Sequence, residues 1–598
     1  MNLPQPELNS QKPSNNRKVI LRKDQNIQFK TDNSEEWTKA RVLGRGGRAT
    51  GKYKNHFNIE KENNEKVCLD FSKTQYAILE QEEEVSGEED YHSSEEVLIS
   101  SKEFSVNEKI EEAKEIEIQN WRNFNVFEET VDKGQSTIST RWVITEKKNV
   151  DNTPIIKARL VVRGFEEEDR SQCDSPTASK STMRTFLLVS ANEGWAPQTI
   201  DIKSAFLQGK PIERDIYIQP PAGFSENGTI WKLKKVVYGL NDAARNWYFS
   251  VAEELQRLGL KQSLVDKALF RSYSDDGSLQ GVFLIHVDDF LIAGTQEFNI
   301  KIESITKKFK VGRRKEADFK YIGLNVNYHQ SCLEINQKDY INEIAKAKIS
   351  DKKMKTKQEP LNKNETREYR RIVGQLNWAA GQTRPDMLIE VVSLSMCAKH
   401  PTIADLILAN KAIDKLKSSE VCIKYGRLGS MENLSLRVYT DASWANLPDG
   451  TSSAGGYVIY AVGENGTCAP VDWSSNKIQR TVHSTLAAES LAMSTGIDAA
   501  IYLGSMLSEI YFHNMKNVFP IDVYTDNKSL QENVCSTKQV KEKRLRVTIA
   551  EIRESLERKY INSIQWISSN DQLADCLTKR GASTASLLET IESNQFMV

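Results

Sequence analysis

The feature that most constrains this chain is a pair of adjacent aspartates between two apolar runs, in the stretch FLIHVDDFLIAG from Phe283 to Gly294. A continuous apolar run on each side is typical of a buried strand, so the stretch predicts a hairpin of two buried strands. Asp288 and Asp289 would lie at its tip, in a protein that otherwise avoids buried charge. A divalent cation would neutralise such a pair, and carboxylate-held metals promote phosphoryl transfer. The alternative is a turn whose aspartates face water.

Bulk properties exclude several classes of protein. The chain has 598 residues, enough for about three or four domains. With 39% hydrophobic and 27% charged residues it fits a soluble globular protein with polar linkers. The net charge of -1 indicates no global basic field, and the eight cysteines include no CxxC pair, so we expect neither a zinc knuckle nor a disulfide framework. The N-terminus lacks a signal-peptide core and no apolar run of about 18 residues exists, so we expect no membrane span.

The first 118 residues divide into a basic and an acidic part. Residues 1–75 form a basic lead followed by a stretch in which Arg and Lys are interleaved with Trp37, Tyr53 and Phe57. That mixture predicts a small β module that touches phosphate, and a solvated basic face is the alternative. Residues 76–118 are acidic with little periodicity, which predicts a disordered linker, with a nucleic-acid mimic as the alternative.

Two further segments resemble the parts of a nucleotide-binding sheet. RWVITEKK and IIKARLVVRGF predict a hairpin in which Lys157, Arg159 and Arg163 share one face, where they could hold a triphosphate or simply face water. In QTIDIKSAFLQG a short strand ends at Asp201, and Phe206 follows closely. A strand ending in Asp, a helix, a strand and an Asp-Asp hairpin fit a mixed α+β polymerase palm, where carboxylates of separate strands share two metals.

Several motifs together resemble the reverse transcriptase of copia-type LTR retrotransposons. They cover about residues 121–400 and read KARLVVRGF, DIKSAFLQG, VYGL with RNWY, HVDD, YIGL and YRRIVGQLNWAAGQTRPDM. The resemblance implies that Asp201 and Asp288 are metal ligands, with Asp289 beside them. It also implies that Phe206 is an aromatic gate against the ribose 2′-hydroxyl and that the YIGL turn braces the primer end. Lys157 and Arg159 would contact the incoming dNTP.

The chain departs from the family in two places within this region. His286 stands where the family often has Tyr, which leaves its effect on nucleotide placement open. The segment after YGL reads NDAAR, from Asn241 to Arg245, where the family has a KQSPR-like sequence. Asp242 is an unexpected neighbour for a phosphate backbone, so the template contact expected there is in doubt.

The C-terminal quarter predicts a second site with four acids. Strands at 434–445, at 455–462 and near Trp473 precede alternating helices and strands, which is the ribonuclease H order. The strings TDASWA, AAES, YTDN and NDQLADCLTK resemble copia-type RNase H. The resemblance implies that Asp441, Glu489, Asp526 and Asp575 bind two metals, although each acid alone is more often a surface charge. Since no histidine follows His513, we expect no histidine general acid in this domain and no ionisation near 6.5 in its pH profile.

These observations predict an α+β polymerase right hand followed by an RNase H-like α/β domain, with a small N-terminal β module. The expected domains are 1–75 (an integrase C-terminal-like GKY module), 76–118 (linker), 119–335 (fingers and palm), 336–430 (thumb and connection) and 431–598 (RNase H). The resemblance implies the 3′ part of a Pol polyprotein that copies RNA into DNA and degrades the RNA of the hybrid.

The predicted cofactor is Mg²⁺, two ions per site, with Mn²⁺ as a substitute. Predicted partners are an RNA template, a DNA primer, the RNA–DNA hybrid, dNTPs, a Gag-like particle and integrase, but no membrane. The resemblance places the chain in a cytoplasmic virus-like particle, with the nucleus as the alternative. A second hypothesis is a relic that binds nucleic acid without turnover. Because all seven expected acids are present, we favour the enzyme.

Overall fold

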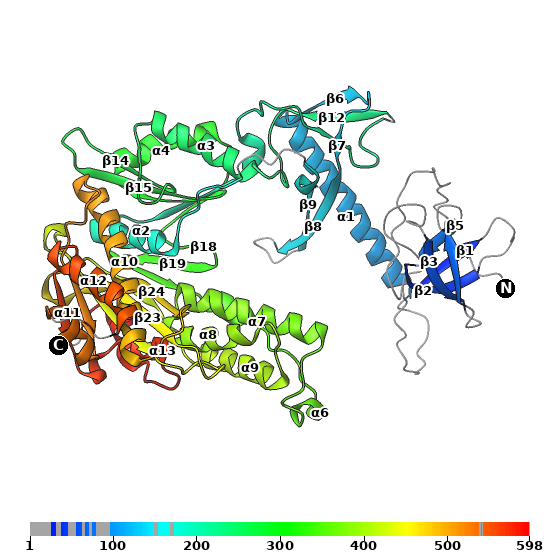
Figure 1. Cartoon of the computed structure of the whole chain (residues 1–598). Helices are drawn as coiled ribbons and strands as arrows, with labels where there is room; N and C mark the ends of the chain where they lie inside the picture. The colour runs from blue at the N-terminus through cyan, green and yellow to red at the C-terminus, as the bar shows by residue number, and fades with distance from the viewer. Residues whose placement is uncertain are drawn as a thin grey trace. The chain divides into compact units, whose positions relative to one another are not determined.

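A computed structural model describes residues 26–30, 38–45, 56–61, 66–70, 75–78, 96–148, 154–167, 173–226, 228–537, 540 and 542–596. The chain divides into two compact units, Met1–Glu103 and Phe104–Val598. Figure 1 shows the helices and strands along the chain. Among the described residues, no helix is long and apolar enough to cross a membrane.

The first unit contains a small antiparallel sheet. Its strands are β1 (Asn26–Lys30), β2 (Thr38–Arg45), β3 (His56–Lys61), β4 (Lys66–Asp70) and β5 (Gln75–Ile78), in the order β4-β3-β2-β1-β5. Ile59 and Ala40 are buried. The prediction of a small β module is therefore confirmed, while the GKY triplet at residues 51–53 lies outside the described residues.

Helix α1 (Glu96–Asn123) corrects the predicted linker. The prediction of a disordered segment over 76–118 is wrong for residues 76–78, which belong to β5, and for residues 96–118, while residues 79–95 lie outside the described part of the chain. Ala113, Ile118 and Trp121 are buried, whereas the acids Glu111, Glu112 and Glu115 are exposed. Their spacing places these apolar residues on one side of a helix, so packing of that side stabilises the segment despite its acidic composition.

The fingers consist of a four-stranded sheet and a long hairpin. The sheet has the order β6 (Phe127–Val131), β12 (Thr229–Leu233), β11 (Tyr217–Ile218), β7 (Thr137–Ile138), and the hairpin pairs β8 (Thr140–Lys148) with β9 (Pro154–Val162). The VYGL and VVRGF motifs meet backbone to backbone, because a Cβ on Gly239 would lie 1.9 Å from the carbonyl oxygen of Val162. Gly239 also has φ +97°, so a larger residue is excluded twice over.

The palm is a six-stranded sheet with helices on both faces, as Figure 1 shows. Its order is β13 (Lys261–Gln262), β14 (Leu269–Tyr273), β15 (Leu279–His286), β16 (Asp289–Gly294), β10 (Gln198–Ile202), β17 (Val311–Glu316). The helices are α2 (Lys180–Glu193), α3 (Ala243–Arg257) and α4 (Gln296–Lys308). Alternate residues of β15 belong to separate cores: Leu284 packs in the core that includes α2, and Phe283 in the core that includes α3 and α4. Burial on both faces explains the continuous apolar run.

The thumb adds a second sheet and a helical bundle. The sheet has the order β18 (Phe319–Tyr321), β19 (Leu324–His329), β20 (Cys332–Asn336), β21 (Ile423–Tyr425). The helices are α5 (Lys338–Glu343), α6 (Asp351–Met354), α7 (Lys363–Gln382), α8 (Leu388–Cys397) and α9 (Ile403–Ser418). The predicted domain boundary at residue 335 is wrong, because it cuts a sheet whose strands come from both sides of it.

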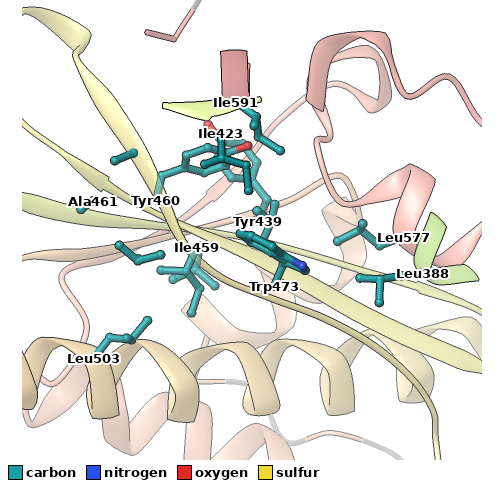
Figure 2. Packing of buried hydrophobic residues seen from close by; sticks show 14 of the residues in the cluster. Leu388, Ile423, Tyr439, Ile459, Tyr460, Ala461, Trp473, Leu503, Leu577 and Ile591 are labelled. Carbon is teal, nitrogen blue, oxygen red and sulfur yellow. The ribbon is translucent and has the colours of Figure 1, made fainter. Parts of the chain in front are cut away.

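The C-terminal quarter has the predicted RNase H topology. Strands β22 (Ser435–Ser443), β23 (Ala454–Val462), β24 (Cys468–Lys477), β25 (Ile521–Thr525) and β26 (Ser563–Trp566) form a sheet in the order β24-β23-β22-β25-β26. The helices are α10 (Thr485–Phe512), α11 (Lys528–Cys535), α12 (Lys543–Glu557), α13 (Asp575–Thr578) and α14 (Ala585–Ser593). Figure 2 shows the core beside this sheet, where the rings of Tyr439 and Tyr460 meet edge to face at 6.4 Å.

Buried ion pairs join the palm to the RNase H quarter. Arg271 of β14 and Glu509 of α10 lie 2.9 Å apart, and both side chains are at most 6% exposed. Arg184 of α2 pairs with Asp472 at 3.1 Å and lies over the ring of Trp473. One hydrophobic cluster continues from the palm through the thumb into the RNase H core. These three parts therefore share one interior.

Candidate active sites

The Asp-Asp hairpin has the predicted form, and its tip is held by α3. Strand β15 ends at His286 and β16 begins at Asp289, so Val287 and Asp288 form the turn. Val287 has φ +56°, a strained value for a β-branched residue. Trp247 donates from Nε1 to the carbonyl oxygen of Val287 at 2.8 Å. The RNWY motif thus supplies a buried donor that fixes the turn, a role that the sequence analysis missed.

The sheet register brings the three palm aspartates, Asp201, Asp288 and Asp289, together. Asp201 on β10 is directly opposite Asp289 on β16, and the amide of Ile202 donates to the carbonyl oxygen of Asp288 at 3.1 Å. Burial, followed by the charges of Asp288 and Asp201, raises the pKa of Asp289 to about 6. Mutual repulsion of this kind indicates a site that favours a cation.

Gly312 makes room for one of these carboxylates. It lies in β17, next to β10, where the register shifts beyond Asp201. A Cβ on Gly312 would lie 2.5 Å from Oδ2 of Asp201. Any larger residue would therefore displace the carboxylate, and nothing in the sequence marks this glycine as part of the site.

The predicted nucleotide contacts meet at Tyr238. The guanidinium of Arg159 lies 5.3 Å from the Tyr238 ring centroid, and the Phe206 ring lies 5.0 Å from it on the palm side. Burial raises the pKa of Tyr238 to about 12, and the charges of Asp288 and Asp201 act in the same direction. Lys157 is exposed, two residues before Arg159 on the same strand. Arg159 and Phe206 thus both lie against Tyr238 of the VYGL motif, and it is this tyrosine that is close enough to Asp288 and Asp201 for their charges to raise its pKa.

The two departures from the family pattern have structural explanations. His286 packs against Tyr321, with ring centroids 6.4 Å apart, and both line a pocket of about 370 Å³ with Trp378 of the thumb. Asp242 is neutralised by Arg214, whose Nη1 lies 2.6 Å from Oδ2 of Asp242. Arg214 also pairs with Glu167 at 2.8 Å. The acid in NDAAR therefore anchors an internal ion-pair network.

In the RNase H quarter, three of the four predicted acids converge. Asp441 lies on β22, Glu489 on α10, and Asp526 directly follows β25. One carboxylate oxygen from each lies within 4.8 Å of the others, and no group that includes the palm aspartates meets this distance among the described residues. Burial raises the pKa of Glu489 well above its ordinary value, with Asp441 and Asp526 adding to the effect. Burial also raises the pKa of Asp441 to about 6.

Asp575 does not join this group, because a lysine lies between it and Asp441. Lys579 Nζ is 2.7 Å from Oδ1 of Asp575 and 3.0 Å from Oδ1 of Asp441. Thr578 donates to the other oxygen of Asp441. Thr578 and Lys579 end the motif NDQLADCLTK, but they lie more than 130 residues after Asp441, so the sequence does not reveal the contact.

A histidine is present where the sequence analysis excluded one. His483 lies within the RNase H quarter, just before α10, and its Nε2 is 3.0 Å from Nη1 of Arg544 on α12. Because His483 and His513 itself lie within this quarter, the absence of a histidine after His513 does not support the expectation of no histidine general acid, which stays a prediction. The expected lack of an ionisation near 6.5 loses its basis.

The RNase H acids fit a divalent ion. Oxygens opposite each other in an octahedral shell lie about 4.2 Å apart when each bond is about 2.1 Å. The oxygens of the convergent group all lie within 4.8 Å of one another, so a small shift of the side chains brings them into such a shell. Oε2 of Glu489 is buried and has no hydrogen-bond partner among the described residues. Hard oxygen donors are the ligands that Mg²⁺ and Mn²⁺ prefer. The catalytic roles of all seven acids stay predictions.

Comparisons with known proteins agree with the motifs. Residues 124–362 match the reverse transcriptase (RNA-dependent DNA polymerase) family. The chain is 28% identical over 473 residues to a retrovirus-related Pol polyprotein from transposon RE1 of Arabidopsis thaliana, covering 75% of this chain and 31% of that protein. It is also 28% identical over 486 residues to the Pol polyprotein from transposon TNT 1-94 of Nicotiana tabacum, covering 75% and 35%. The predicted resemblance to copia-type Pol polyproteins is confirmed.

The chain spans about a third of the length of these curated relatives. Among solved structures, a foamy viral protease-reverse transcriptase in complex with double-stranded DNA covers 76% of this chain and 70% of that chain, at 15% identity and a TM-score of 0.47.

Proposed function

We propose that this relative of the retrotransposon Pol polyproteins is an RNA-directed DNA polymerase that also degrades the RNA strand of the RNA–DNA hybrid. The observation that carries the proposal is the cross-strand pairing of Asp201 with Asp289 at the tip of the Asp-Asp hairpin. The family match over residues 124–362 supports the polymerase half. The convergence of Asp441, Glu489 and Asp526 supports the ribonuclease half.

In the palm, Asp201 and Asp288 would hold Mg²⁺, with Mn²⁺ as a substitute. Bound divalent ions neutralise the charge that develops on a phosphoryl group in transfer. Arg159 and Lys157 would bind the triphosphate of the dNTP, since cationic side chains suit phosphate oxygens. Phe206, supported by Tyr238, would exclude a 2′-hydroxyl by its bulk.

In the RNase H quarter, the convergent acids would hold the metal. Glu489 supports this assignment because its buried oxygen has no partner among the described residues. Asp441 and Glu489 share a buried environment that disfavours two negative charges, so a cation would stabilise both ionised forms. Asp575, which contacts the far side of Lys579, would be a further carboxylate ligand of the metal.

Primer extension tests the proposal directly. The full chain is incubated with a DNA primer on an RNA template, dNTPs and Mg²⁺, and both extended DNA and RNA fragments are measured. We expect both products, and expect EDTA to abolish both. If the chain binds the hybrid tightly but yields neither product with Mg²⁺ or Mn²⁺, it is the binding relic of the second hypothesis.

We further propose that the chain works with a Gag-like particle and integrase, in a cytoplasmic virus-like particle. Its similarity to about a third of longer Pol polyproteins supports this setting. Co-expressed with a Gag-like protein, the chain should sediment with RNA-containing particles. Recovery only as a free protein would contradict the proposal.

A further inference from the structure

Lys579 is a cation built into the RNase H site. Its side chain is 37% exposed, yet its Nζ contacts Asp441, which is fully buried, and Asp575. Both carboxylate oxygens lie within hydrogen-bond distance of the same nitrogen. The lysine is therefore held between two acids.

The surrounding chain fixes this lysine in place. It follows α13, where Cys576, Leu577 and Thr578 are buried. The amide of Lys579 donates to the carbonyl oxygen of Asp575 at 2.9 Å, which fixes the lysine and the aspartate relative to each other. The contact with Asp441 then reaches from this short helix to the central strand β22.

Asp441 has two kinds of neighbour. One of its oxygens lies within 4.8 Å of an oxygen of Glu489 and of one of Asp526, a group that suits a divalent ion. Its Oδ1 also contacts the ammonium group, which in turn contacts Asp575. Glu489 has a buried oxygen with no partner among the described residues, whereas Asp575 already has a cationic partner, so the need for a further cation is greater at Glu489.

We propose that Lys579 takes the place of one of the two expected divalent ions. Asp441, Glu489 and Asp526 bind one ion, and the Asp441–Asp575 pair binds a second only when the ammonium group withdraws. An ammonium group a few Å from a divalent ion repels it, so the two compete for the same oxygens. This inference rests on the proposed ribonuclease function of the same acids.

Mn²⁺ binding to the full chain tests the proposal without relying on activity. All proteins carry Asp201→Asn and Asp288→Asn, so that the palm contributes equally, and free Mn²⁺ is measured by electron paramagnetic resonance. The parent should bind one Mn²⁺ in the RNase H quarter. Lys579→Met should bind a second with affinity raised about tenfold or more, and Lys579→Arg, which keeps the charge, should behave as the parent.

Two further variants assign the ions and separate the possible failures. Asp575→Asn added to Lys579→Met should remove the second ion, and Asp441→Asn should remove the first. If Asp441→Asn changes no binding, the proposed ribonuclease site itself is wrong. If Asp441→Asn removes an ion but Lys579→Met adds none, or if the parent already binds two ions there, only the role of the lysine is overturned. Lys579→Gln repeats the test if the methionine variant does not fold.

Discussion

The palm aspartates and the RNase H acids hold their charges in different surroundings. Asp201, Asp288 and Asp289 are partly exposed on one hairpin and its neighbouring strand. Asp441 and Glu489 are almost completely buried, and each comes from a separate element. The palm thus assembles its acids by strand register, with α3 fixing the turn through Trp247, whereas the RNase H quarter brings one of its acids in on a helix packed against its sheet.

The difference determines how each site tolerates its charge. In the palm, solvent reaches all three aspartates and screens their mutual repulsion, although partial burial still raises the pKa of Asp289 to about 6. In the RNase H quarter, Lys579 offsets the buried charge of Asp441. A change in a neighbouring residue should therefore affect the two sites differently, since solvent compensates charge in the palm and Lys579 does so in the RNase H quarter.

The largest expected effect separates the two sites completely. Asp288→Asn should reduce DNA synthesis by about 10³-fold, because it removes one metal-ligand charge, and leave RNA cleavage intact. Asp441→Asn should do the reverse. Primer extension and hybrid cleavage on the same preparations measure both, so each activity is the control for the other. Equal loss of both activities in either variant would contradict the separation.

A substitution in the interior that the palm and the RNase H quarter share should affect both sites alike. Glu509→Ala leaves Arg271 buried without its partner, which costs about 3–5 kcal/mol of unfolding free energy. Both activities should then fall together on mild heating. Denaturant titration of the full chain measures the loss, and Glu253→Ala, which removes an exposed pair with Lys210, should change stability by less than about 1 kcal/mol. Loss of one activity alone would show that the domains unfold independently.

Gly312→Ala should affect the palm only. The added Cβ would meet the Asp201 carboxylate, so we expect about a 100-fold loss of polymerisation, equivalent to about 2.7 kcal/mol. RNA cleavage by the same protein is the control and should not change. Polymerisation at the parent rate would mean that Asp201 can move without cost.

Phe206→Ala should relax sugar selection. A methyl group leaves room for a 2′-hydroxyl, so the ratio of kcat/KM for dNTPs over rNTPs should fall by about tenfold. Phe206→Tyr keeps the ring and should retain the parent's ratio. If the alanine variant discriminates between dNTPs and rNTPs as the parent does, Phe206 does not exclude the 2′-hydroxyl.

The smallest expected effect is on how the free energy of unfolding depends on pH when no metal is bound. The pKa of Asp289 is raised from 3.8 to about 6, so between these values the folded chain keeps a proton that the unfolded chain has lost. Stability should therefore fall as pH rises through this window. In EDTA, Asp289→Asn should remove the part of that fall that Asp289 contributes, while the raised pKa values of Asp441 and Glu489 still contribute theirs. The variant should be the more stable protein above pH 6, by about 1 kcal/mol after allowance for the solvent exposure of Asp289. Thermal melts at pH 4 and pH 7 test this, and identical pH dependence would contradict the raised pKa.

The order of the helices and strands, and the acids able to bind metal, could be predicted from the amino-acid sequence. Continuous apolar runs around Asp288 and an alternating strand before Asp441 specify buried strands, because burial on one or both faces sets the periodicity. The acidic composition around α1 hid a narrower apolar stripe, and the helix was missed for that reason.

Which side chains contact one another could be seen only in the tertiary structure. Lys579 reaches Asp441, His483 reaches Arg544, and Gly312 adjoins Asp201, although each pair is far apart in the sequence. Such contacts depend on strand register and on how helices pack across a sheet. Because these are set by the packing of the whole interior and not by local periodicity, the motifs identify the acids but not the lysine and glycine that adjoin them, nor the histidine that adjoins Arg544.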